Sequence, residues 1–79
     1  MKDKFIINLG TLKRVNDFVH DMSDFKSDID IIRGRYIIDG KSYLGLLSLD
    51  LFIPLDVKIN TNDIDELTLF NEVIQKYLN

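Results

Sequence analysis

The chain has 79 residues, of which 46% are hydrophobic and 29% are charged, and its formal net charge is −3. This length and composition exclude a disordered or low-complexity protein and predict one small globular domain over residues 1–79. The acidic balance provides no overall field that would attract nucleic acid or an anionic membrane, so neither is an expected partner.

The absence of cysteine excludes disulfides and Cys-ligated zinc, and it agrees with a reducing compartment. The longest apolar runs are far shorter than the roughly 20 residues that a membrane-spanning helix needs. No apolar signal-peptide stretch follows the first residues, MKDKFIIN. We therefore expect a soluble, cytoplasmic protein.

The first half of the chain predicts a strand, a helix and a hairpin. Residues 4–9, KFIINL, are β-branched and aromatic, which is typical of a strand. Apolar residues then recur at three and four positions, which predicts an amphipathic helix over 11–24 with Thr11 as its N-cap. Residues 27–40 contain two β-branched runs on either side of a turn at Gly34. The expected core stripe of the helix consists of Leu12, Val15, Val19 and Met22, with Phe18 alongside.

The second half predicts a short helix, a strand and a final helix. Ser42 is the expected N-cap of the short helix, which contains a glycine and is therefore weak. Residues 54–60 alternate between apolar and polar, as in a half-buried strand whose proline lies at its entrance. The last helix is expected to begin at Asn62 and Asp63. Its core stripe consists of Leu67, Phe70, Ile74 and Tyr77.

This order of elements predicts an α+β fold. A few strands, a hairpin and helices with one apolar stripe each favour a single four-stranded antiparallel sheet with three helices on one face, which is an open-faced sandwich.

Two cations occupy an unusual place in the first turn of the first predicted helix. The positive end of the helix dipole disfavours Lys13 and Arg14 there, whereas the last helix begins with Asp65 and Glu66. Together with Thr11 and the free backbone N–H groups, the two cations predict a site for phosphate or sulfate. The alternative is two solvated side chains, which cost only about a few tenths of a kcal/mol each.

Two stretches, FVHDMSDFKSDIDI and IIDGKSYLGLLSL, resemble HPr, the histidine-containing phosphocarrier of the bacterial sugar phosphotransferase system. The resemblance covers nearly the whole chain and includes the order of elements. The segment GKSYLGLLSL is similar to the segment around the regulatory serine of that family, which places this serine at Ser42. The resemblance implies the βαββαβα open-faced sandwich of HPr.

The HPr pattern has a phosphorylated histidine at the start of the first helix, but LGTLKRVN contains none. An ungapped comparison places Thr11 at the histidine position, and a register with one residue deleted places Leu12 there. A threonine ester has too low a transfer potential and leucine cannot accept phosphate. His20 lies roughly 13 Å further along the helix and cannot substitute. We therefore do not expect a competent phosphocarrier. The sequence contains no Gly-rich phosphate loop, nucleophile–base pair or paired catalytic carboxylates, so we expect no enzyme, no catalytic residue and no cofactor.

The same analogy makes Ser42 the expected site of a regulatory kinase; the alternative is a plain N-cap worth about 1 kcal/mol. Residues 43–55 include nine apolar residues, more than a short helix and loop can bury, which indicates an exposed partner-binding patch. Tyr43, Leu44 and Leu47 are its expected contact residues, with extra core as the alternative. The partners that the resemblance implies are an HPr kinase, Enzyme I, sugar-specific phosphotransferase subunits or a transcriptional regulator.

The sequence thus leads to one hypothesis and two alternatives. The leading hypothesis is a non-catalytic, HPr-like regulatory or adaptor protein that acts through its first two helices and is switched at Ser42. The alternatives are a decoy that binds phosphotransferase partners without carrying phosphate, and a small anion-binding module. His20 is expected on the polar or boundary face of its helix, and it has no second histidine to complete a metal site, so no metal is expected.

Overall fold

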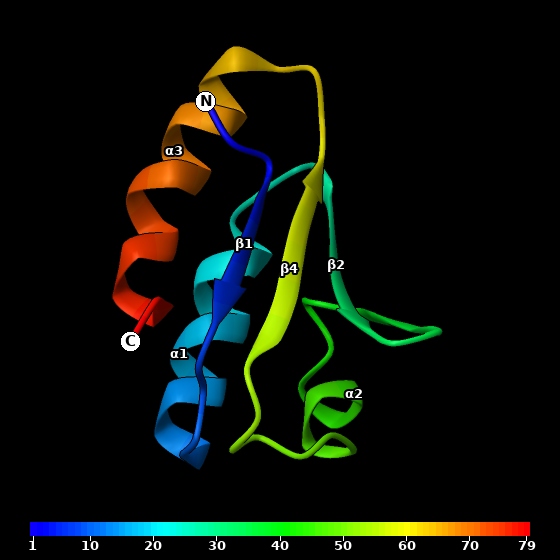
Figure 1. Ribbon diagram of the computed structural model, residues 1–79. Helices are drawn as coiled ribbons and strands as arrows, with labels where there is room; N and C mark the ends of the chain where they lie inside the picture. Colours follow the sequence, from blue (N-terminus) through cyan, green and yellow to red (C-terminus); the bar gives the residue numbers. More distant parts are fainter.

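The computed structural model describes residues 1–79, and its elements follow the predicted order (Figure 1). The last helix continues directly into a short 3₁₀ helix, η1, which the sequence pattern does not separate from it. The elements are β1 (Lys4–Ile7), α1 (Leu12–Ser23), β2 (Asp28–Arg33), β3 (Tyr36–Asp39), α2 (Tyr43–Leu47), β4 (Leu55–Asn60), α3 (Ile64–Val73) and η1 (Ile74–Tyr77).

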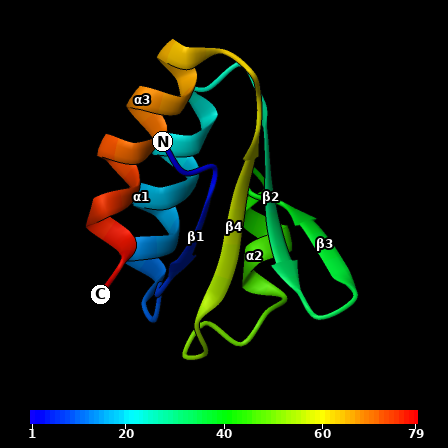
Figure 2. The ribbon, with the colours of Figure 1, turned by 45° about the horizontal axis from the view of Figure 1, so that its top comes forward.

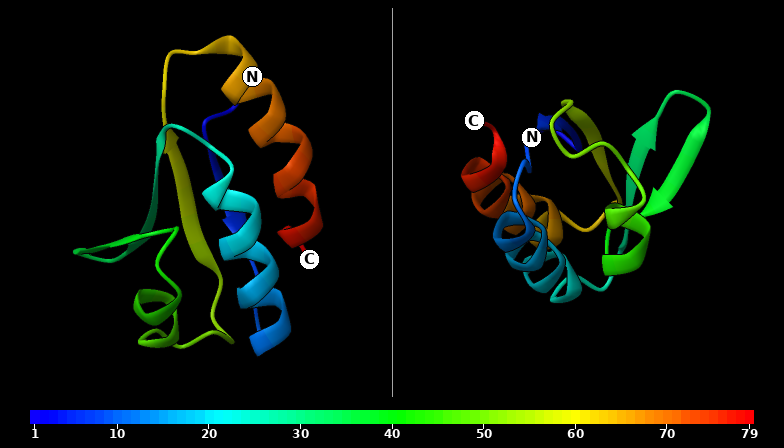
Figure 3. Two further views of the ribbon diagram at one scale, coloured as in Figure 1. Left: turned by 180° about the vertical axis from the view of Figure 1, so that it is seen from behind. Right: turned by 90° about the horizontal axis from the view of Figure 1, so that it is seen from below.

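The four strands form one antiparallel sheet in the order β1-β4-β2-β3. Val57 of the central strand β4 pairs with Phe5 of β1 on one side and Ile31 of β2 on the other. All three α-helices lie on the same face of this sheet, and the other face is left open (Figures 2 and 3). The predicted open-faced α+β sandwich is therefore confirmed.

Local sequence signals explain where the helices begin and where the hairpin turns. The side chains of Thr11, Ser42 and Asp63 each accept a hydrogen bond from a backbone N–H of the first helical turn, at 2.9 to 3.1 Å. Gly34 has a φ of +58°, the left-handed value that a first central residue of a type II′ hairpin turn requires. The predicted caps Thr11 and Ser42 and the predicted turn are confirmed, and Asp63, expected only at the start of the last helix, is its cap.

The core lies between the inner face of the sheet and the apolar stripes of the helices. Leu12 is an exception, because the prediction placed it in the stripe of α1 and it is 60% exposed. The first turn of α1 extends past the ends of the strands (Figure 1). The core residues are Phe5, Ile7, Leu9, Val15, Phe18, Met22, Phe25, Ile29, Ile31, Leu46, Leu55, Val57, Ile59, Phe70, Ile74 and Tyr77.

Gly40, which joins β3 to α2, is required by a close approach to β2. Its N–H donates to the Ile29 carbonyl at 2.7 Å. A Cβ at this position would lie 2.7 Å from Ile29 Cγ2 and 3.1 Å from the Ile29 carbonyl oxygen. We therefore expect Gly40→Ala to destabilise the fold by about 1 to 3 kcal/mol, measured by urea denaturation. A variant as stable as the wild type would mean that the link between β3 and α2 can move away from β2.

Candidate functional site

The start of α1 lies at the same end of the molecule as α2 and the loop that follows it (Figure 1). Gly10 N–H donates to the Leu51 carbonyl of this loop at 2.9 Å. Thr11 Oγ1 accepts from Arg14 N–H, and the regular helical ladder begins with Val15 N–H bonded to the Thr11 carbonyl. The N–H groups of the first two helical residues therefore have no partner within the helix.

Lys13, one of the predicted anion-binding residues, is directed along α1. Its Nζ lies 2.9 Å from Asp17 Oδ2, one turn further on, and the Lys13 side chain is 85% exposed. An exposed pair of this kind adds little stability, so Lys13 is essentially a solvated side chain in this arrangement.

Arg14 is directed away from the start of the helix, toward β1 and the end of the chain. Its Nε and Nη2 donate to the Asn8 carbonyl at 3.2 and 2.6 Å, and Nη2 also donates to the Asn79 carbonyl oxygen at 3.0 Å. The guanidinium lies 5.5 Å from the centre of the Tyr77 ring, close enough for a cation–π contact. These contacts explain why the first turn of α1 tolerates this cation.

The three residues predicted to bind an anion thus engage three different partners. Thr11 caps the helix, Lys13 pairs with an acidic side chain, and Arg14 binds carbonyl oxygens. Anion binding by this group stays a prediction, and it would require Lys13 and Arg14 to exchange their present partners for the ligand.

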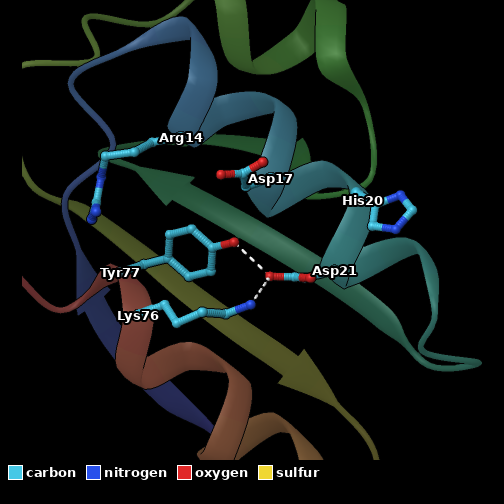
Figure 4. Close-up of a pocket in the computed structure, with 6 residues that line it drawn as sticks. All are labelled: Arg14, Asp17, His20, Asp21, Lys76 and Tyr77. Carbon is cyan, nitrogen blue, oxygen red and sulfur yellow. Dashed lines mark hydrogen bonds and ion pairs between the residues drawn. The ribbon is translucent and has the colours of Figure 1, made fainter.

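A pocket of about 230 Å³ lies between α1 and η1 (Figure 4). At its centre, Asp21 Oδ2 accepts a hydrogen bond from Tyr77 Oη at 2.5 Å and pairs with Lys76 Nζ at 2.7 Å. The lining residues are Arg14, Asp17, His20, Asp21, Lys76 and Tyr77.

The surroundings shift the pKa values of both members of the Asp21–Tyr77 pair. Burial alone would raise the pKa of Asp21, but hydrogen bonds from Lys76 and Tyr77 outweigh it and hold the pKa below its ordinary value. Burial, followed by the hydrogen bond to Asp21 and the charge of Asp21, raises the pKa of Tyr77 well above its ordinary value. At neutral pH the carboxyl is therefore ionised and the phenol protonated, so the pair connects α1 to η1 and does not exchange protons.

Sequence reasoning missed this connection between α1 and η1. The sequence pattern marks Asp21 only as a polar residue of the first helix, and Tyr77 only as part of the core stripe of the last helix. The available signal is an acidic residue beside the apolar stripe of one helix and a Lys-Tyr pair in the last turn of another. That signal does not specify a contact across 56 positions of sequence.

The apolar segment 43–55 is partly buried and partly exposed. Leu44 and Phe52 are 78% and 85% exposed, whereas Tyr43 and Leu47 are partly buried and pack against the core. Of the three predicted contact residues, only Leu44 therefore projects freely into solvent. Phe52, which belongs to the predicted patch but not to its three expected contact residues, is the most exposed large apolar side chain of the chain.

Other classes of site are not evident. His20 is exposed on α1, as expected, and borders the pocket. No three or more side chains of the metal-binding types lie together. None of the helices combines the length and the hydropathy that a membrane crossing requires.

The order of elements, the strand order and the one-sided helices define the chain as an α+β open-faced sandwich. Its fold is that of the HPr phosphocarriers. The HPr-C-His protein from Thermoanaerobacter tengcongensis is similar in structure, with a TM-score of 0.71, 18% identity and coverage of 96% of this chain and 93% of that one.

A second similar structure is a histidine-containing phosphocarrier protein that provides structural evidence for the evolutionary divergence of Mycoplasma from Gram-positive bacteria. Its TM-score is 0.66 and its identity 18%, and the comparison covers 95% of this chain and 96% of that one. No family model and no curated protein matches the sequence. At this level of identity the likeness is one of fold.

Proposed function

We propose that this chain is a non-catalytic HPr-like regulatory or adaptor protein that works in the cytoplasm through protein contacts. The observation that carries the proposal is the start of α1 in an otherwise HPr-like fold. Thr11 and Leu12 occupy the place where the resemblance puts the phosphorylated histidine, and the Thr11 hydroxyl is engaged as a helix cap.

The only histidine of the chain does not repair this loss. His20 lies eight residues after the first residue of α1, which is roughly 12 Å along the helix. It borders the pocket that α1 forms with η1, on the third turn rather than at the open N-terminus. A phosphoryl donor that docks at the start of α1 would not reach it.

Ser42 supplies the regulatory part of the proposal. It lies between β3 and α2, is partly exposed, and its Oγ accepts from Gly45 N–H at 3.1 Å. The resemblance of GKSYLGLLSL to the regulatory segment of HPr makes it the residue that a kinase of the HPr kinase type would modify. A phosphate at this place would sit beside Leu44 and change the surface that a partner meets.

The exposed apolar side chains supply the docking part. Leu12, Leu44 and Phe52 are 60%, 78% and 85% exposed on the first turn of α1, on α2 and on the loop after α2. These three elements lie at one end of the molecule (Figure 1). Apolar side chains concentrated in this way favour a protein partner, such as Enzyme I, a sugar-specific phosphotransferase subunit or a transcriptional regulator.

The test is intact-protein mass spectrometry after incubation with HPr kinase and ATP, with Enzyme I and phosphoenolpyruvate as the parallel arm. We expect one added phosphoryl group in the kinase arm and none in the Enzyme I arm. Ser42→Ala should abolish the addition. Ser48→Ala, which removes another serine hydroxyl at the opposite end of α2, should not.

Each arm can contradict the proposal. Acid-labile phosphate transferred from Enzyme I to any residue would make the chain a phosphocarrier after all. Binding to Enzyme I without transfer, lowered by Phe52→Ala but not by Ile64→Ala on the exposed start of α3, would identify the decoy. No addition and no binding in either arm would remove the phosphotransferase connection.

A further inference from the structure

The helices leave one face of the sheet open (Figure 3), and this face is here called the outer face. The strand register places its residues in two rows that run across all four strands. Residues that pair directly across antiparallel strands project from the same face of the sheet. Because Phe5, Val57 and Ile31 point into the core, their neighbours along each strand point outward. The strand register therefore determines which residues lie on the outer face.

The first row consists of four charged residues, with the two positive charges on one half of the sheet and the two negative charges on the other. Lys4 on β1 pairs in register with Lys58 on β4, Lys58 pairs with Asp30 on β2, and Asp30 pairs with Asp39 on β3. From one edge of the sheet to the other, the charges are positive, positive, negative and negative. None of these four charges forms an ion pair, because the two ion pairs of the chain lie on α1 and between α1 and η1. Asn60 bridges the two central charges, since it accepts from Lys58 Nζ at 3.3 Å and donates to Asp30 Oδ2 at 2.8 Å.

The second row is apolar at both ends. It consists of Ile6 on β1, Asp56 on β4, Ile32 on β2 and Ile37 on β3. Ile6 and Ile37 are 60% and 67% exposed, although isoleucine is among the residue types most often buried.

We propose that the outer face docks on the outer face of a second copy of this chain. We consider a two-fold axis that runs parallel to the strands, between β4 and β2. This axis places β1 over β3 of the second copy, and it places each row opposite the same row of the second copy. Lys4 then faces Asp39 of the second copy, and Lys58 faces its Asp30. Ile6 faces Ile37 in the other row.

The separated charges select this partner and this orientation. Facing its own reverse, the row forms four pairs of opposite charge, whereas after a slip by one strand it forms two opposite pairs and one pair of like charge. Twisted sheets pack face to face in the aligned way that this axis produces, with their strand directions within about 30° of each other. In this symmetric contact each of the four charges of the row faces an opposite charge of the second copy.

The available area makes this contact a weak one. Four strands of four to six residues span about 300 Å² of sheet per copy, well below the roughly 800 Å² per partner of a stable complex. Asp56 adds to the cost, since it would face Ile32 of the second copy and lose hydration. The expected dissociation constant is therefore about 0.1 to 1 mM.

The test follows translational diffusion and amide chemical shifts by NMR as the chain is diluted from about 2 mM to about 0.02 mM. We expect concentration-dependent shifts confined to β1, β2, β3 and β4 and slower diffusion at the higher concentration. Raising the salt concentration from about 0.02 M to about 0.5 M should weaken association several-fold, because the charge row is screened.

Charge reversal tests the pairing across the axis. Lys4→Glu places two acidic residues opposite each other and should weaken association at least about tenfold. Lys13→Glu makes the same change of charge on an exposed residue of α1, on the covered side of the sheet, and should leave association unchanged. Asp39→Lys should weaken association by a similar factor, provided that thermal denaturation shows it to be folded, because Asp39 Oδ1 also accepts from Lys41 N–H at 2.9 Å.

Mixing the two reversed variants gives the decisive result. When two copies of the same variant meet, like charges face each other at both ends of the row. In a mixed pair, the new glutamate of one chain faces the new lysine of the other, and the unchanged Lys4 and Asp39 face each other at the opposite end. Equimolar Lys4→Glu and Asp39→Lys proteins should therefore associate about as well as the wild type.

Two outcomes contradict the proposal. One is a wild-type chain that stays monomeric up to about 2 mM. The other is association that Lys4→Glu leaves unchanged, which would point to the free edge of β3 or to Leu44 and Phe52.

Discussion

Phe70→Ala is expected to lower the free energy of unfolding by about 3 to 5 kcal/mol. Phe70 is fully buried on α3, and its ring lies 5.8 Å from that of Phe5 on β1 and 5.9 Å from that of Phe25 before β2. Its removal leaves a cavity where helix, strand and loop meet. A domain of 79 residues has about 4 to 12 kcal/mol in total, so much of the variant should be unfolded at 37 °C.

Urea denaturation followed by far-UV circular dichroism measures this loss, and Leu69→Ala is the matched control. Leu69 is the preceding residue of α3 and is 42% exposed, so its truncation should cost less than about 1 kcal/mol. Similar losses for the two variants would mean that α3 is not fixed by the aromatic cluster of Phe5, Phe25 and Phe70.

The elements of this fold could be predicted because each has a local signal. Alternation marks β4, three-and-four spacing marks α1 and α3, and Thr11, Ser42 and Asp63 are caps of the preferred chemical types. Leu12 shows where a periodic pattern is insufficient. Its spacing fits the stripe of α1, but whether the first turn has anything to pack against depends on where the strands end, which the pattern does not contain.

The contacts of the charged residues could not be predicted in the same way. Lys13 and Arg14 are unusual in the first turn of a helix, and their neighbourhood suggests an anion. The structure gives Arg14 carbonyl partners at Asn8 and Asn79, which lie 6 and 65 positions away in sequence. A guanidinium reaches such distant partners only after the sheet and helices have brought them together, so no local pattern reports them.

The acid stability of the fold is expected to depend on Asp21, whose folded pKa lies below the value of 3.8 for an unperturbed side chain. Near and below pH 3.8 the unfolded chain therefore binds more protons at this position than the folded chain does. The contribution of Asp21 to stability is fully present above that pH. It is lost as the pH falls through the folded pKa, because a protonated Asp21 no longer attracts Lys76.

Asp21→Asn should therefore be less stable than the wild type at neutral pH and should lose less further stability on acidification, as measured by urea midpoints at pH values on both sides of 3.8. Tyr77→Phe should reduce the acid dependence in part, since it removes one of the two donors that hold the carboxylate. Asp17→Asn is the control on the same helix; its pair with Lys13 is exposed and adds little. If Asp21→Asn retains the full acid dependence of the wild type, the contact between α1 and η1 does not depend on the charge of Asp21, and Phe18 packing edge-on against Tyr77 at 5.2 Å must hold the two elements together instead.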